Sequence, residues 1–254
     1  MRVFRTRQFR ETAIRILMSN ELIILSITTV SLAFFHTMFG PDHYIPFIML
    51  SKARNWSLAK TSLVTFLCGI GHILSSVLLG LTGLALGIAV NKLVSIESVR
   101  GEIAGWLLIA FGLVYMVWGI KRAVKNRPHT HGHFHLDGST HEHTHSHQRE
   151  EHLHIHEQEK KNVTPWALFL IFVFGPCEPL IPLVMYPAAQ GNIFGVVTVT
   201  VIFGVITIAT MMSIVVVSYL GASLIPFKKI ERYTHALAGA AILLCGVSIQ
   251  FLGL

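Results

Sequence analysis

Four side chains able to bind a metal ion lie within long apolar stretches of the sequence. They are His36, Asp42, His43 and His72. Ionisable residues are costly in an apolar segment and usually mark an ion path or a ligand cluster. Imidazole nitrogen together with a carboxylate suits nickel, cobalt or zinc better than calcium or magnesium. The sequence therefore predicts a transition-metal site, although each histidine alone could also be a polar residue at a helix contact.

The spacing of His36 and His43 predicts a break in the helix between them. Residues seven apart on an unbroken helix share a face, but their side chains are separated by about 10 Å. That distance is too long for one shared ion. Gly40-Pro41 lies between the two histidines, and a helix interrupted there can fold back and close the gap.

A second group of reactive residues lies in Gly175-Pro176-Cys177-Glu178-Pro179. A thiolate and a carboxylate could complete the metal site, or Glu178 could carry a proton. Cys177 could equally be a buried small hydrophobic residue, as free cysteines commonly are. The predicted metal ligands inside the apolar segments are thus His36, Asp42, His43, His72, Cys177 and Glu178.

A polar stretch in the middle of the chain contains eleven histidines, mostly at alternating positions. Alternate residues of an extended chain share a side, so neighbouring imidazoles can chelate one ion. Such tracts are typical of metal binding, and a solvated linker, a pH-sensing segment and a purification tag are the alternatives. The predicted loop ligands are His129, His131, His133, His135, His141, His143, His145, His147, His152, His154 and His156.

The composition indicates a membrane protein that positions these residues on helices. Hydrophobic residues make up 52% of the chain and charged residues 13%, whereas soluble domains carry about 25% charged residues. Six apolar segments stand out, and several reach the roughly 20 residues needed to cross a bilayer. They cover residues 22–49, 61–90, 103–120, 166–186, 196–225 and 236–254.

The charged residues gather outside these segments. A net charge of +7 would suggest a nucleic-acid partner in a soluble protein; here the basic residues fit membrane edges, so we expect lipid and no nucleic acid as a partner. Thirteen of the twenty Lys and Arg fall on the side that carries the histidine-rich stretch, which favours the cytoplasm for that side. Five arginines near the N-terminus suggest a basic segment on the membrane surface.

Two halves of the chain resemble each other at an offset of 135 residues. Residues 39–43 match 174–178, with Phe-Gly-Pro in both, and Gly69 falls on Gly204. Each half holds three apolar segments, so the copies would be inverted relative to each other, as in many transporters. We therefore predict an all-α protein of six transmembrane helices in two inverted three-helix repeats with broken first helices. Its parts are a surface segment at 1–20, repeats at 21–120 and 165–254, and a loop without fixed structure at 121–164.

The chain resembles the nickel/cobalt transporter superfamily, in particular its six-span NicO branch with the RcnA-type exporters and UreH-like proteins. The resemblance rests on His36 with Asp42-His43, on Gly69-Ile70-Gly71-His72, and on the histidine-rich stretch. One departure is that five residues, instead of four, separate His36 from Asp42. The resemblance implies a transporter, not an enzyme, in a bacterial or archaeal cytoplasmic membrane. Its transported ion would be Ni²⁺ or Co²⁺, with Zn²⁺ or Fe²⁺ as alternatives.

Several interpretations remain open at this stage. Efflux of the metal is expected from a cytoplasmic metal-collecting loop, with uptake as the alternative. A membrane thiol redox carrier of the DsbD type is an alternative of another class, but it needs two cysteines able to pair, and the counterpart of Cys177 is Asp42. An intramembrane metalloprotease is excluded because no His-Glu-x-x-His motif occurs. A second copy of the chain or a metallochaperone could be a further partner.

Overall fold

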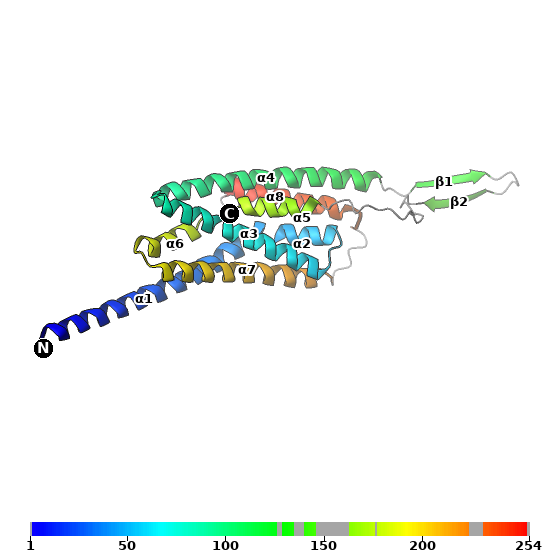
Figure 1. Ribbon diagram of the computed structural model, residues 1–254. Helices are drawn as coiled ribbons and strands as arrows, with labels where there is room; N and C mark the ends of the chain where they lie inside the picture. Colours follow the sequence, from blue (N-terminus) through cyan, green and yellow to red (C-terminus); the bar gives the residue numbers. More distant parts are fainter. Residues whose placement is uncertain are drawn as a thin grey trace, which may run out of the picture.

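The computed structural model describes residues 2–125, 129–134, 140–145, 163–175, 177–223 and 231–252. Its elements run in the order α1 (Arg2–Phe39), η1 (Pro41–His43), α2 (Ile45–Ala53), α3 (Leu58–Ala85), α4 (Val90–Lys125), β1 (His129–Phe134), β2 (Thr140–His145), α5 (Val163–Phe174), α6 (Leu180–Ala189), α7 (Ile193–Ser223), η3 (Glu231–Tyr233) and α8 (Thr234–Leu252). The helices form one elongated bundle (Figure 1).

Within the described residues, five helices are long and apolar enough to cross a membrane. They include Asn20–Phe39 of α1, together with α3, α4, α8 and Ile193–Gly221 of α7. Their outward-facing side chains are large and apolar, such as Leu78 and Val205, as expected for a protein surrounded by lipid. The prediction of a multi-pass, α-helical membrane protein is confirmed at this level.

The first and fourth apolar segments are each divided by a break. Helix α1 ends at Phe39, one residue before Gly40-Pro41, because proline has no N–H to donate and its ring clashes with the preceding turn. A single 3-10 turn, η1, then leads into α2. The fourth segment is divided into the short apolar helices α5 and α6, on either side of a sequence that contains Pro176 and Pro179. The breaks predicted from the Gly-Pro pairs are present.

Helices α4 and α8 lie side by side and pack through glycines (Figure 1). A Cβ added to Gly112 would overlap the main chain of Leu243, and one added to Gly239 would overlap the main chain of Met116. Gly119 and Gly246 make the same kind of contact. Small residues let helix backbones approach closely where apolar burial alone gives no driving force between helices. The backbones of α4 and α8 are therefore in direct contact.

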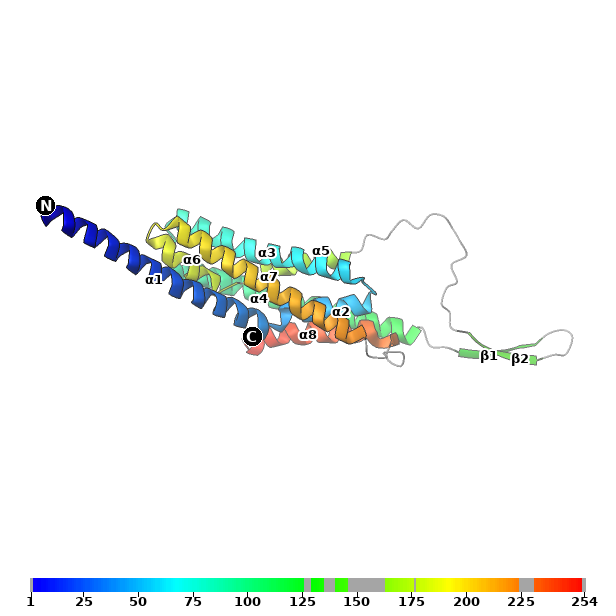
Figure 2. The ribbon, with the colours of Figure 1, turned by 90° about the horizontal axis from the view of Figure 1, so that it is seen from below.

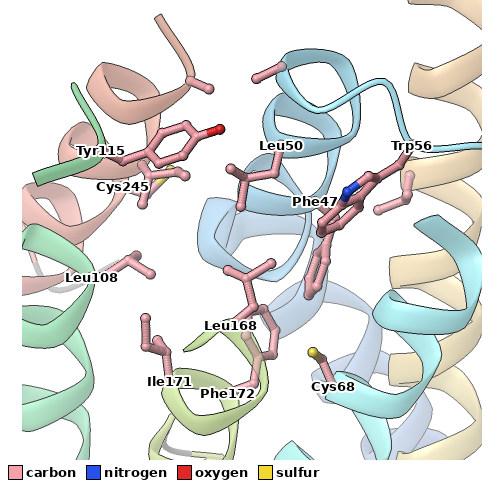
Figure 3. Packing of buried hydrophobic residues seen from close by; sticks show 14 of the residues in the cluster. Phe47, Leu50, Trp56, Cys68, Leu108, Tyr115, Leu168, Ile171, Phe172 and Cys245 are labelled. Atoms are coloured by element: carbon pink, nitrogen blue, oxygen red, sulfur yellow. The ribbon is translucent and has the colours of Figure 1, made fainter. Parts of the chain in front are cut away.

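A cluster of buried apolar residues joins α2, α3, α4, α5 and α8 (Figure 3). The rings of Phe47 on α2 and Phe172 on α5 lie 4.8 Å apart between centroids. Leu168 and Leu50 are fully buried in the same cluster, and Cys68 belongs to it from α3. The cluster thereby fixes α2, just after the first break, against α5, just before the second. Residues near the two breaks are brought together for this reason.

Part of the histidine-rich segment forms a β-hairpin backbone, where the sequence suggested no regular structure. Strands β1 and β2 pair in antiparallel register, with His129 opposite His145, His131 opposite His143 and His133 opposite His141. The predicted loop ligands His135, His147, His152, His154 and His156 lie outside the described residues. At the other end of the molecule, the basic segment is not a separate element, because α1 runs without interruption from Arg2 and projects beyond the bundle (Figure 2).

Candidate metal centre

Three of the predicted ligands meet beside the first break. His36 comes from the last turn of α1, His43 from η1, and His72 from the middle of α3. Each offers one ring nitrogen, and the three nitrogens lie within 4.8 Å of one another. His43 and His72 are 3% and 2% exposed. Three imidazoles that converge in a buried place form an arrangement able to hold one metal ion.

The break explains how residues seven apart reach one point. The ring centroids of His36 and His43 are 4.9 Å apart, about half of the separation expected on a continuous helix. His72 lies 5.2 Å from His43 between ring centroids. The expectation that the Gly40-Pro41 break closes the gap between His36 and His43 is confirmed.

Main-chain carbonyls orient two of the rings. Nδ1 of His43 donates to the carbonyl of Gly40 at 3.1 Å and lies 3.1 Å from Oδ1 of Asp42. Nδ1 of His72 donates to the carbonyl of Phe172 at 3.3 Å. Because a carbonyl can only accept, these contacts require a proton on Nδ1 of both rings, which in the neutral imidazole leaves the lone pair on Nε2. Hydrogen bonds of this kind fix the tautomer and the orientation of metal-binding histidines.

The Nε2 atoms of His36, His43 and His72 are buried and have no hydrogen-bond partner within the described part of the chain. A buried polar atom without a partner is costly, and native proteins rarely leave one. Three such atoms in one cluster are explained together if they share a metal ion. A tetrahedral site with metal–nitrogen bonds of about 2.05 Å needs its nitrogens roughly 3.3 Å apart. Modest side-chain movement would therefore close the site around an ion.

The other predicted ligands do not join this cluster. Asp42 acts on it indirectly, through its contact with Nδ1 of His43. Cys177 is fully buried among apolar side chains that include Ile73 and Leu180. Glu178 is exposed. The structure thus brings together His36, His43 and His72, and it places Asp42 where it would orient a ligand.

A cavity of about 400 Å³ opens beside the histidines. Its lining contains His36, Asp42, His43 and His72. The rest of the lining is mostly apolar and includes Phe35, Leu108, Ile171, Phe172 and Ile249. The volume exceeds that of a single ion, so water or a small ligand could occupy the coordination positions that the histidines leave open.

Two contributions to the site were missed by the sequence analysis. The carbonyl of Phe172 has no signature in the sequence, because any residue supplies a carbonyl. The charged residues Glu97 and Arg100 fall between the predicted apolar segments 61–90 and 103–120, but the structure places them in α4, which begins at Val90. Their spacing of three residues, next to an apolar run, was a signal that could have placed them on a helix.

Gly40 sets the position of the His43 ring. A Cβ added there would lie 2.5 Å from Nδ1 and 2.8 Å from Cε1 of His43. We expect Gly40→Ala to displace the ring and lower the affinity for a transition-metal ion by about tenfold, as for other losses of ligand orientation. A competition titration with a chromophoric chelator measures this. Gly80→Ala is the matched control, because a Cβ at Gly80 meets no atom within 4 Å. Equal affinities in the two variants would contradict this role of Gly40.

Together, the bundle and the buried histidine cluster define a polytopic helical membrane protein with a candidate metal centre. Residues 45–248 match the family described as the cytochrome c biogenesis protein transmembrane region. The chain belongs to this family. No match is found among curated proteins or among solved structures.

The match corrects the assignment to the nickel/cobalt transporter superfamily, which is wrong. Nickel or cobalt efflux, inferred from that assignment, is overturned with it, and the uptake alternative rested on the same resemblance. The resemblance was carried by short motifs, and His36, Asp42 and His43 precede the matched region 45–248. Short histidine motifs recur in many unrelated metal-binding proteins, whereas the family match extends over both halves of the chain, from residue 45 to residue 248. Of the alternatives, the match favours the DsbD-like thiol carrier.

Proposed function

We propose that this member of the cytochrome c biogenesis family binds one transition-metal ion inside its helical bundle. The observation that carries the proposal is the set of three buried Nε2 atoms, on His36, His43 and His72, without a partner in the described chain. Imidazole ligands suit zinc, cobalt, nickel, iron and copper ions. The Nδ1 contacts of His43 with Gly40 and Asp42, and of His72 with Phe172, supply the orientation that such ligands need.

We also propose that the bundle is a six-span structure made of two inverted repeats, with α5 and α6 together as the fourth span. Helix contacts support it. In the repeat, α1, α2, α3 and α4 correspond to α5, α6, α7 and α8. The contact of α1 with α7 is therefore repeated as that of α5 with α3, and the contact of α2 with α8 is repeated as that of α6 with α4. The repeats differ in chemistry, because Cys177, Glu178 and Thr207 stand in the second half where Asp42, His43 and His72 stand in the first. Only the first break would therefore hold the ion.

The proposal is tested on protein purified in detergent, with residues 129–156 deleted so that the histidine-rich segment does not contribute. Titration with Co²⁺ is expected to saturate at one ion per chain and to give visible d–d absorption, since cobalt reports ligand number and geometry. Zn²⁺, Ni²⁺ or Cu²⁺ should displace it. Failure of each of these ions to bind stoichiometrically to folded protein would refute the proposal.

A thiol redox carrier is the second candidate, and the family match favours it. Oxidation of a dithiol to a disulfide releases two electrons and two protons, so it requires two cysteines within bonding reach. Cys68, Cys177 and Cys245 are all free and buried. Cys177 belongs to a different buried cluster from Cys68 and Cys245, so a carrier built on Cys177 would form its disulfide with a thiol of another molecule.

The two candidates differ in what they require of Cys177. Since its side chain is 0% exposed, we expect a maleimide reagent to label it only after denaturation, with Cys177→Ser leaving Co²⁺ affinity within about twofold. Mass spectrometry of the labelled peptide measures the first result, and titration measures the second. Rapid labelling of native protein that is blocked by prior oxidation would favour the thiol carrier.

A further inference from the structure

An ion pair lies inside α4, outside the set of three histidine ligands. Oε1 of Glu97 accepts a hydrogen bond of 2.8 Å from Nη1 of Arg100. The Glu97 side chain is 0% exposed and that of Arg100 is 17% exposed. Charged residues within a membrane-spanning helix are costly and usually functional. The metal centre described above uses neither of them directly.

Arg100 joins two helices through a single nitrogen. Its Nη2 donates to the Ser75 hydroxyl at 2.8 Å and to the Val173 carbonyl at 2.7 Å. Ser75 is on α3, and its hydroxyl in turn donates to the carbonyl of His72 at 2.8 Å. Val173 is in the last turn of α5, where the break leaves carbonyls without a helical partner. The guanidinium therefore holds the end of α5 against the turn of α3 that carries His72.

The neighbouring carbonyl of α5 is the one that orients the metal ligand. Phe172 accepts from Nδ1 of His72, and Val173, the next residue, accepts from Arg100. Two adjacent carbonyls at the C-terminal end of α5 thus accept hydrogen bonds, one from His72 and the other from Arg100. A displacement of this helix end would move the acceptor of His72 and release its ring to rotate.

Glu97 holds the guanidinium of Arg100 in place, and it also lies beside the second break, between α5 and α6. Its second oxygen, Oε2, is buried and has no hydrogen-bond partner among the described residues, and the Ser76 side chain and the main chain of Cys177 lie near the carboxylate. Ser76 and Cys177 are both buried. The carboxylate therefore supports Arg100 from one side and borders the chain between α5 and α6 on the other.

We infer that Arg100, held by Glu97, is a positioning residue that fixes His72 as a metal ligand through the C-terminal end of α5. The inference rests on the proposed metal binding and adds a residue pair that links the second break to the ion held at the first. Arginine suits this position because its planar fork serves Glu97, Ser75 and Val173 from two nitrogens, whereas all three donors of a lysine lie on one atom.

The test compares Arg100→Met, Arg100→Lys and Ser75→Ala with Arg122→Met in the protein lacking residues 129–156. Arg122 is an exposed residue on the same helix, over the ring of Trp118, and serves as the matched control. We expect Co²⁺ affinity to fall about 10- to 100-fold for Arg100→Met, the range for lost outer-shell partners. Arg100→Lys should fall about tenfold and Ser75→Ala about threefold to fivefold, while Arg122→Met stays unchanged.

The Co²⁺ spectrum separates positioning from general support of the fold. Loss of a merely structural contact would lower the amount of folded protein but leave the affinity and the d–d bands of the folded fraction unchanged. That result in Arg100→Lys and Ser75→Ala would overturn the inference, including where Arg100→Met yields no folded protein. Altered bands with weaker binding would support it. If the unsubstituted protein binds no Co²⁺, the proposed function itself fails.

Discussion

Replacing His72 by alanine is expected to lower the affinity for a bound transition-metal ion by about 100- to 1,000-fold. Binding of about 10–16 kcal/mol spread over four ligands in structural zinc sites corresponds to roughly 2.5–4 kcal/mol for each ligand. His72 is 2% exposed and comes from α3, a different element from His36 and His43. The variant therefore leaves only two imidazoles, both beside the first break.

Two measurements check the His72 prediction on protein lacking residues 129–156. Titration with Co²⁺ gives the affinity, and thermal unfolding with and without metal gives the stabilisation, which is about 2.7 kcal/mol for the unsubstituted protein at a free-ion concentration 100 times Kd. We expect this metal-dependent stabilisation to disappear in the variant. His235→Ala is the control, because His235 lies on α8 and contacts Tyr115 and Trp118. Equal losses in the two variants would contradict a site at His72.

Gly112→Ala is expected to destabilise the folded protein by about 3 kcal/mol, at the upper end of the usual cost of overpacking. The new Cβ would lie 2.7 Å from Cα of Leu243 and 2.9 Å from the carbonyl oxygen of Gly239. These neighbours are main-chain atoms of α8, so no side chain can rotate away, and the two helices must separate along their contact. Weak apolar forces between helices in lipid do little to offset this loss of packing.

Unfolding in detergent, followed by circular dichroism or tryptophan fluorescence, measures the Gly112 effect. Gly80→Ala is again the matched control, since it adds the same methyl group to a helix where no atom lies within 4 Å. That control should be neutral or slightly stabilising, because alanine reduces the freedom of the unfolded chain. Stability equal to that of the control would mean that α4 and α8 do not pack as described.

The sequence predicts the parts of this protein that depend on composition and local backbone chemistry. Long apolar runs predict the helices, since a chain in lipid must form all of its backbone hydrogen bonds internally. Gly40-Pro41 gives the first break, and the break makes it possible for His36 and His43 to share an ion. Because these features are local, they can be read from a few consecutive residues.

Features that depend on contacts between distant segments were not predicted. Cys177 resembles a ligand by its position in the repeat, yet its side chain packs among apolar residues. Arg100 reaches α3 and α5, and no local pattern reports those partners. The family assignment was wrong for a related reason, since short histidine motifs describe a type of ligand and not the ancestry of the fold.

The glycine contact between α4 and α8 has a consequence for how this sequence can change over time. At Gly112 and Gly239 each backbone fills the space that a side chain on the other helix would need. A larger residue at either position would therefore push the partner helix away. No substitution in the partner can restore the space, since glycine is already the smallest residue. Among related chains, these positions should vary far less than the lipid-facing positions beside them, such as Leu113 and Val114, where many apolar residues are interchangeable.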